Sequence, residues 1–366
     1  MRLLHLGFED PAMPGSGGGS VRTHEINRRL AQRGHKITVL TTRYPGCVDR
    51  VQDGVRYEHV GLGTGHNRLT RLLGYILGLP VAARRHDADL VIEDFFAPFS
   101  TMAAPLWTGR PTIGVVQWLH AKSKSRQYRL PLHLLETAGV RAHHRLIAVS
   151  RGTGDQLLGM NPQLRVDVIE NGVDSRAFIP AQQLGNDIVY IGRLEIAGKG
   201  LDLLLEAWER IHNRMVGSLV IAGTGPDETK VRRQAERLGI AGRVQFVGWV
   251  SGFDKFRLLN QARVVVVPSR HETFGLVALE ALAAATPVVI FDIPSLREVV
   301  PDDCGWRVPA FDIDSLADQL TDIYADGHAL LSAGRAGRQF ASTYSWDALA
   351  ARQASVYAAA LHPQGQ

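Results

Sequence analysis

Cysteine is scarce in this chain of 366 residues. The two cysteines, Cys47 and Cys304, lie far apart in the sequence. Two distant thiols make neither a disulfide framework nor a cluster of metal ligands, and such usage suits a reducing compartment.

Long apolar runs are missing too. The longest, from Leu72 to Ala83, contains Pro80 and is too short to cross a bilayer. The first eight residues, MRLLHLGF, lack the length and the cleavage site of a signal peptide. We therefore expect a cytoplasmic protein without a membrane-spanning segment.

Charge is unevenly distributed. Residues 1–180 carry 23 Lys and Arg against 15 Asp and Glu, whereas residues 181–366 carry 18 against 21. A basic first half favours an anionic partner such as a membrane surface or an acidic acceptor, although a solvated basic surface would read the same way. We expect no nucleic-acid partner, because there is no zinc-finger or RNA-recognition signature and no aromatic interleaving of the basic residues.

What the sequence does contain is a repeated alternation of short β-branched runs with longer amphipathic stretches. This pattern is typical of parallel sheets covered by helices on both faces. Strands are predicted at 2–7, 36–42, 88–94, 111–118, 145–150 and 165–170, and after a break at 186–192, 217–223, 243–248, 262–269 and 286–292. Helices are predicted at 21–33, 201–212, 313–325, 328–341 and 346–361.

The break between the two sets of strands is a Gly-, Pro- and Asn-rich segment at 171–186. It predicts two doubly wound α/β domains, residues 1–172 and 173–345, with 346–366 packing back on the first. Two such domains leave a cleft at the carboxyl ends of their strands, where ligands bind in these folds.

The segment RHETFGLVALEALAAATPVV carries two acids, Glu272 and Glu280. Glu272 falls on the loop that enters a helix, and Glu280 lies among alanines and leucines within it. Both could be ordinary helix charges. An acid in so apolar a helix is costly to bury without a partner, and a ribose diol is one such partner.

The segment GRLEIAGKGLDLLLEAW places Arg193 and Lys199 on a glycine-rich turn before a helix. Free N–H groups at the helix start, a guanidinium and an ammonium together suit a diphosphate; the alternative is two solvated basic residues on a loop. Gly223, in IAGTGP, ends a further strand in a tight turn.

These segments, with VQFVGWV, LIAVSRGTGDQLL, VIENGVD and the tail YSWDALAARQASVYAA, resemble the retaining family-4 glycosyltransferases over nearly the whole chain. The resemblance implies the GT-B architecture, two facing Rossmann-like domains, with the acceptor on the first and a nucleotide-diphosphate sugar, UDP- or GDP-linked, on the second. It implies transfer of a sugar to a hydroxyl acceptor on a glycan, glycolipid or small glycoside.

Site residues follow from the same resemblance. Arg193 and Lys199 are expected to bind the donor diphosphate, Glu280 the ribose hydroxyls, and Glu272 the donor sugar. His120 resembles the active-site histidine of the family, with a surface histidine of its polar stretch as the alternative. Further donor contacts are expected from Gly18, Gly223, Phe274, Gly275 and Leu276, and an acceptor-side loop from Gly17, Gly18, Gly19 and Arg22.

The glycine-rich stretch GSGGGS, residues 15–20, lies between the first predicted strand and helix. Glycines there let backbone N–H groups approach a ligand, and Ser20 is expected to cap a helix beginning at Val21. In the family the following helix often carries a histidine, a place for which Arg22 and His24 compete.

Mechanistically, the resemblance implies front-face attack with retention, the leaving phosphate taking the acceptor proton. No Asp-x-Asp pair ends a predicted strand, so no metal or other cofactor is expected. The sequence departs from the family pattern at two places near the expected donor site, so the donor sugar is not predicted. Ala285 stands where glycine is common in the family, and IPSLREVV replaces a Gly-Gly turn.

Three alternatives stay open. A dehydrogenase fits poorly, because Ser20 replaces the third glycine of the dinucleotide fingerprint that Gly15 and Gly17 begin. A nucleotide-sugar epimerase or a phosphorylase shares the two-domain layout. A catalytically silent relative would bind only sugar or membrane, and the intact Arg193, Lys199, Glu272 and Glu280 argue against it. The basic, leucine-rich stretches 66–86 and 120–145 would lie on an anionic membrane and reach a lipid-linked acceptor, although they fit the outer faces of ordinary domain helices as well.

Overall fold

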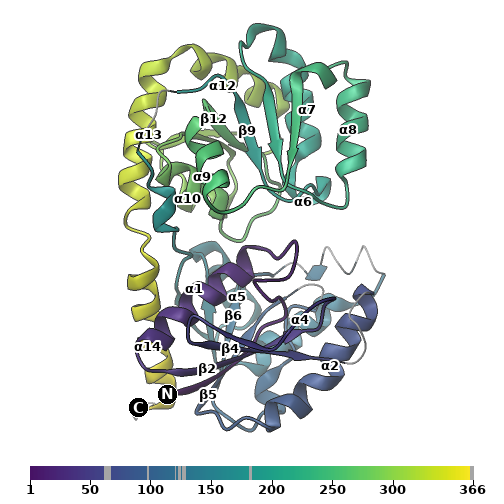
Figure 1. The fold of residues 1–366 in the computed structure, drawn as a ribbon, viewed down its shortest axis with the longest axis vertical. Coiled ribbons are helices and arrows are strands. Elements are labelled where there is room, and N and C mark those ends of the chain that lie inside the picture. Colours follow the sequence, from purple (N-terminus) through teal and green to yellow (C-terminus); the bar gives the residue numbers. More distant parts are fainter. Residues whose placement is uncertain are drawn as a thin grey trace. The chain divides into compact units, whose positions relative to one another are not determined.

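The structure, a computed structural model, describes residues 1–61, 67–96, 99–119, 121–122, 125, 129–180 and 184–362. Contacts between Cα atoms divide the chain into two compact units (Figure 1). The first unit is Met1–Gly172 with Trp346–Gln366, and the second unit is Val173–Ser345. The predicted fold class, two doubly wound α/β sheets, is confirmed.

The first unit is built on an eight-stranded sheet with the order β3-β4-β2-β1-β5-β6-β7-β8. All neighbours are parallel except β3 and β4, which form an antiparallel hairpin at one edge. The elements are β1 (Arg2–Leu6), α1 (Gly18–Gln32), β2 (Lys36–Thr42), β3 (Arg50–Gln52), β4 (Val55–Val60), α2 (Arg68–Arg84), β5 (Leu90–Asp94), η1 (Ala104–Leu106), β6 (Thr112–Val116), α4 (Leu132–Ala142), β7 (Arg145–Ala148), α5 (Arg151–Met160), β8 (Arg165–Val168) and α14 (Trp346–Leu361).

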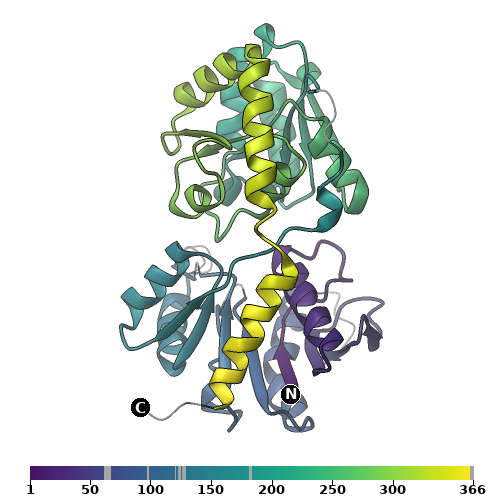
Figure 2. The same ribbon diagram turned by 90° about the vertical axis from the view of Figure 1, so that its left-hand side faces the viewer.

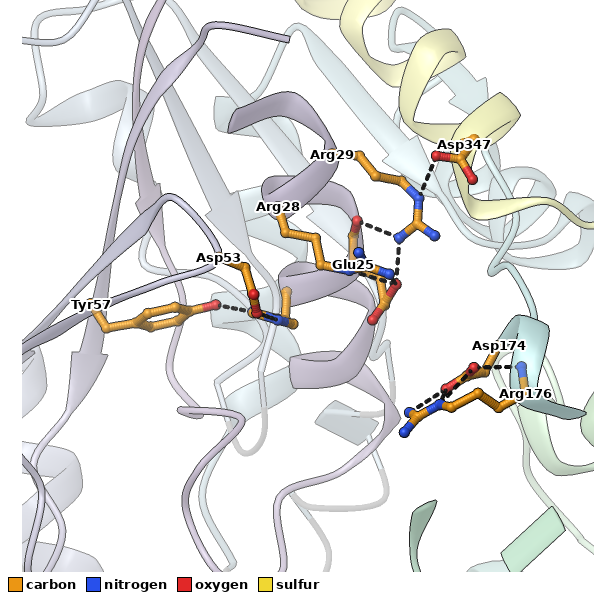
Figure 3. Close-up of polar contacts among 9 residues, drawn as sticks. Glu25, Arg28, Arg29, Asp53, Tyr57, Asp174, Arg176 and Asp347 are labelled. Atoms are coloured by element: carbon orange, nitrogen blue, oxygen red, sulfur yellow. Dashed lines mark hydrogen bonds and ion pairs between the residues drawn. The ribbon is translucent and has the colours of Figure 1, made fainter. Parts of the chain in front are cut away.

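Side chains of the first unit's strands point alternately to the two faces of the sheet and contribute to a hydrophobic core on each face. On β1, Leu3 packs with residues of α1 and α14, whereas Leu4 packs with residues of α2 on the opposite face. Helix α14 therefore completes one face of this sheet, and Figure 2 shows it beside α1. An ion pair joins the two helices, because Arg29 contacts both Glu25 on its own helix and Asp347 on α14 (Figure 3).

The second unit has a six-stranded, all-parallel sheet with the order β11-β10-β9-β12-β13-β14. Its elements are η2 (Ser175–Ala177), β9 (Ile188–Ile191), α6 (Ile196–Lys199), α7 (Leu201–Ile211), η3 (His212–Arg214), β10 (Leu219–Ala222), α8 (Glu228–Arg237), η4 (Ala241–Arg243), β11 (Val244–Gly248), α9 (Gly252–Gln261), β12 (Val264–Val267), α10 (Leu276–Ala283), β13 (Val288–Phe291), α11 (Pro294–Val299), β14 (Gly305–Val308), α12 (Ile313–Ala325) and α13 (Gly327–Ala341). Helices α7 and α12 pack together over one face, around Trp208 and Leu320.

Among the described strands, β3, β4 and β14 were not predicted from the sequence. The hairpin β3–β4 turns at Asp53 and Gly54, both with positive φ of 50° and 79°. An Asp-Gly pair between β-branched runs is the usual signal for such a turn, so the sequence did contain this hairpin.

Candidate active site

The strand order of the second unit locates its ligand-binding edge. Counting β9 as the first strand, the order 3-2-1-4-5-6 is that of a dinucleotide-binding Rossmann sheet. In such sheets ligands bind at the carboxyl ends of the strands, where the chain order reverses. Here the reversal lies between β9 and β12, so the loops that follow these two strands form the candidate site of this unit.

The loop after β9 carries Arg193 and Lys199. The Arg193 side chain is exposed and has no ion pair or hydrogen bond to any residue that the structure describes. The start of this loop packs tightly against the end of the neighbouring strand, β10. A Cβ on Gly223, which follows β10, would lie only 1.9 Å from the carbonyl oxygen of Gly192. Gly223 thus permits the close backbone approach that holds the Arg193 loop, with a φ of 134° that few other residues adopt.

The loop after β12 carries Glu272 and leads into α10. The hydroxyl of Ser269 donates to Oε1 of Glu272 at 3.0 Å. Phe274 is buried, and Gly275, with a φ of 100°, is the N-cap of α10, which begins at Leu276. No carbonyl in the described part of the chain accepts from the backbone N–H groups of Gly275 and Leu276, as expected for a helix start.

Lys199 and Glu272 meet: the Lys199 ammonium donates to Oε1 of Glu272. The two loops are also joined through their backbones, since the N–H groups of Arg270 and His271 donate to the Gly198 carbonyl at 2.8 and 3.1 Å. The structure therefore brings together two of the residues that the sequence pointed to, 73 positions apart.

Glu280 is 5% exposed and lies in the second turn of α10. Its Oε1 accepts a hydrogen bond of 2.5 Å from Nζ of Lys255, a residue of α9. Sequence reasoning missed Lys255, because a lone lysine in an amphipathic helix is ordinarily a solvated charge.

In the first unit the strand order reverses between β1 and β5. The loop after β1, residues 7–17, is anchored by Asp10, which is fully buried. Arg50 donates to both carboxylate oxygens of Asp10 at 2.7 Å, and Nε2 of His59 lies 2.8 Å from Oδ2. Glu9 accepts from the Gly17 N–H at 3.0 Å. Buried charged side chains thus hold this glycine-rich loop in addition to its backbone hydrogen bonds.

The glycine-rich stretch differs from its prediction. Helix α1 begins at Gly18 with Gly17 as N-cap, so Gly18 and Gly19 lie in its first turn. Ser20 does not cap a helix beginning at Val21, since its hydroxyl donates to the Gly17 carbonyl at 2.8 Å. Because α1 begins at Gly18 and not at Val21, the free N–H groups of its first turn lie directly after the loop of residues 7–17.

Arg22 is not a loop residue. It lies within α1 with 1% exposure, and one terminal nitrogen donates to the Ile169 carbonyl at 3.2 Å and to Gln353 of α14 at 2.9 Å. Its competitor His24 is also engaged, 2.8 Å from the Tyr57 hydroxyl and 3.1 Å from Asp53. Both residues therefore tie α1 to its surroundings inside the first unit.

A polar network that sequence reasoning missed lies at the ends of β5 and β6. Asp94 is buried, accepts from the Thr23 hydroxyl at 2.6 Å and lies 3.0 Å from Nε2 of His5. Burial alone would raise the pKa of Asp94, but the charge and hydrogen bond of His5 and the bond from Thr23 bring it below its usual range. Gln117 Nε2 donates to Thr23 at 3.2 Å and to Asp94 at 3.3 Å.

His120 lies outside the described residues. Within the described part of the chain, no three His, Cys, Asp or Glu side chains are arranged to hold a metal ion. In the same part, no helix is both long and apolar enough to span a membrane.

Comparison with known proteins identifies the family of the chain. Residues 174–340 match the model of "Glycosyl transferases group 1", and residues 16–176 match that of "Glycosyltransferase Family 4". A D-inositol 3-phosphate glycosyltransferase of Xylanimonas cellulosilytica is 31% identical, with 96% of this chain and 94% of the relative covered.

Solved structures show the same fold. A sucrose-phosphate synthase of Thermosynechococcus elongatus superposes with a TM-score of 0.84 and 22% identity, over 97% of this chain and 98% of that one. Anabaena HepE in complex with UDP-glucose gives a TM-score of 0.77 and 17% identity, over 98% and 100%. The fold is therefore GT-B, and the chain belongs to the group 1 glycosyltransferases of family 4, which transfer a sugar from a nucleotide-sugar donor.

Proposed function

We propose that the second unit binds a nucleoside diphosphate sugar across the loops after β9 and β12. The diphosphate would lie beside Arg193 and Lys199, the sugar beside Glu272, and the ribose diol on Glu280. The observation that carries this proposal is the meeting of Lys199 and Glu272 at the reversal of strand order. HepE, of the same fold, is described in complex with UDP-glucose, which supports UDP as the first donor nucleotide to test.

Charge explains how this site would accelerate transfer. As the glycosidic bond breaks, negative charge grows on the departing diphosphate. The Lys199 ammonium, held by Glu272, and the N–H groups at the start of α10 are positive groups in place before the reaction. The exposed Arg193 guanidinium adds a cation that is free to turn toward the diphosphate. Preorganised groups of this kind contribute a large share of enzymatic rate enhancement.

The donor proposal is tested by thermal unfolding in UDP, GDP and ADP, since a bound nucleotide stabilises the folded state by mass action. Arg193→Gln should abolish most of the shift. Arg214→Gln is the matched control, because Arg214 is exposed and precedes β10, at the opposite edge of the sheet. An equal loss in both variants, or no shift with any nucleotide, would contradict the proposal.

We further propose retention of anomeric configuration without a metal. Both carboxylates of the candidate site, Glu272 and Glu280, form ion pairs with lysines. Their proposed roles, on the sugar and on the ribose, assign neither as a nucleophile, and front-face attack needs none. Proton NMR of the first product formed would give its configuration, and activity should survive EDTA. An inverted product would rule out this mechanism, and an epimerised donor would rule out transfer itself.

The acceptor is proposed to bind the first unit through a hydroxyl group, close to the loop after β1. Helix α2 supports contact with an anionic membrane at the cytoplasmic face. Leu73, Leu77 and Val81, spaced by one helical turn, are all exposed, and Arg84 and Arg85 are exposed beyond them. An apolar stripe with basic residues at its end is the pattern of helices that lie in a membrane interface.

Vesicles of phosphatidylcholine with phosphatidylglycerol should co-sediment the protein at low salt, and added salt should release it. Leu77→Glu should weaken this binding. Leu331→Glu serves as control, because Leu331 is also exposed but lies in the second unit on α13. Absence of sedimentation at low salt would end the membrane proposal without touching the donor proposal.

A further inference from the structure

The two glutamates of the candidate site each have a lysine partner, and the second partner has no role in the function proposed above. Lys199 reaches Glu272 from the loop after β9, whereas Lys255 reaches Glu280 from α9. Lys255 is mostly buried, with a side chain 22% exposed, and its ammonium also lies 4.8 Å from the centre of the Phe256 ring. It is therefore a fixed cation and not a solvated one.

Glu280 needs such a cation. Its neighbours Ala278, Leu279, Ala281 and Leu282 are fully buried, and the Glu280 side chain itself is 7% exposed. A carboxylate in such surroundings is costly unless an opposite charge compensates it. The Lys255 ammonium supplies that charge at hydrogen-bond distance.

The pairing also leaves part of the carboxylate unused. Lys255 bonds to Oε1, and Oε2 of Glu280 has no hydrogen-bond partner in the described part of the chain. An ionised carboxylate offers about four acceptor sites on its two oxygens. Since a vicinal diol brings two O–H donors, Glu280 can accept both without breaking its bond to Lys255.

A second acid does not compete for the lysine by hydrogen bonding. Asp174 interacts electrostatically with Lys255, but its carboxylate oxygens are held by the Arg176 side chain and backbone N–H (Figure 3). The ammonium therefore makes its close contact with Glu280.

We infer that Lys255 is a positioning residue for recognition of the donor ribose, acting through Glu280 and not by touching the diphosphate. This inference rests on the proposed binding of a nucleoside diphosphate. Its consequence is specific: loss of the Lys255 charge should weaken only the contact with the ribose hydroxyls.

The test compares UDP and GDP with their 2′,3′-dideoxy counterparts by titration calorimetry, using whichever base binds. The unaltered protein should bind the natural diphosphate at least about tenfold more tightly than the dideoxy form, because hydroxyl groups bonded to a carboxylate are lost. In Lys255→Gln this ratio should fall to about threefold or less. Affinity for the dideoxy form should change by less than about twofold.

Companion variants separate a positioning role from a structural one. Lys255→Arg should keep most of the ratio, and Glu280→Gln should lose it, with no further loss in the double variant. Lys36→Gln, an exposed lysine of the first unit, should change nothing. If Lys255→Gln fails to fold, the comparison rests on Glu280→Gln and the double variant, which bury no uncompensated carboxylate; a further loss of the ratio in the double variant would overturn a role that acts through Glu280.

The outcomes separate two failures. If the unaltered protein binds no diphosphate, the proposed function itself fails and the inference falls with it. If it binds both forms equally, or if Lys255→Gln weakens both forms equally, nucleotide binding stands and the role assigned to Lys255 is overturned.

Discussion

Arg270 and Asp202 form a two-pronged ion pair: both terminal nitrogens of the guanidinium lie 2.7 Å from the two carboxylate oxygens. Asp202 is in the first turn of α7, next to the loop of Lys199, and Arg270 lies two residues before Glu272. The same guanidinium donates to the Ile196 carbonyl at 3.0 Å. The pair therefore fastens the two halves of the candidate donor site.

Arg270→Ala should lower kcat/KM by about 10²-fold, because small misplacement of positioning groups has costs of this size. The kcat/KM of Arg270→Lys should lie between those of Arg270→Ala and the unaltered protein, since an ammonium cannot reproduce the two parallel bonds. The measurement is steady-state transfer with the donor identified by thermal unfolding. Arg145→Ala is the control: it removes a similar pair with Asp167 in the first unit, and comparable loss there would contradict a local effect.

Gln117 should contribute to acceptor binding. Because its amide nitrogen donates to Thr23 and to Asp94, its carbonyl oxygen faces away from them, and the Cβ site of Gly19 lies 3.4 Å from that oxygen. Such an oxygen accepts a bond from a hydroxyl. Gln117→Leu should raise the KM for the acceptor about tenfold and leave nucleotide affinity unchanged. Gln156→Leu, an exposed glutamine on α5, is the control, and an unchanged KM would refute this role.

Ala285 should limit stability. It follows Ala284, the C-cap of α10, with a φ of 60°, and the Thr286 N–H donates to the Ala281 carbonyl, as in a Schellman motif. Glycine adopts this conformation without the strain that alanine bears, so Ala285→Gly should raise the free energy of unfolding by about 0.5–1 kcal/mol. Ala284→Gly, with a φ of −74°, should lower it instead. Urea unfolding measures both, and destabilisation by Ala285→Gly would show that the strain is absent.

His59 should make stability depend on pH. Burial alone would lower the pKa of His59, but its bonds to Asp10 and Asp49 raise it above the usual value. A raised pKa in the folded state stabilises fully below the unfolded pKa, near 6.5, and the effect is lost as pH rises through the folded pKa. His59→Asn should therefore cost about 1–2 kcal/mol more at pH 5.5 than at pH 9.

The pH measurement is urea unfolding of both proteins across that range. Asp10 does not interfere: its pKa is lowered, since hydrogen bonds from Arg50 and His59 outweigh its burial. Its stabilisation is present throughout this window and would be lost only at much lower pH. A cost that does not vary with pH would show that the pKa of His59 is the same in the folded and unfolded chains.

Local pattern predicted most of the elements. Strand β2 and helices α12 and α14 have the bounds expected from periodicity, because residue spacing alone reports which face of an element is buried. Helix α1 begins three residues earlier than predicted. The prediction placed Gly18, Gly19 and Ser20 in a loop because glycine and serine are common in loops. The edge hairpin β3–β4 was missed although its Asp-Gly turn is a local signal.

The sequence by itself determined the alternation of strands and helices, the two halves of the chain, and the basic and acidic residues at strand ends. Only the tertiary structure decided that β9 and β12 are neighbours, which places Lys199 on Glu272, and that α9 packs on α10, which places Lys255 on Glu280. The reason is physical: periodicity and turn chemistry act over a few residues. Strand order and charge pairing depend on which surfaces bury together, and that is settled by the whole fold.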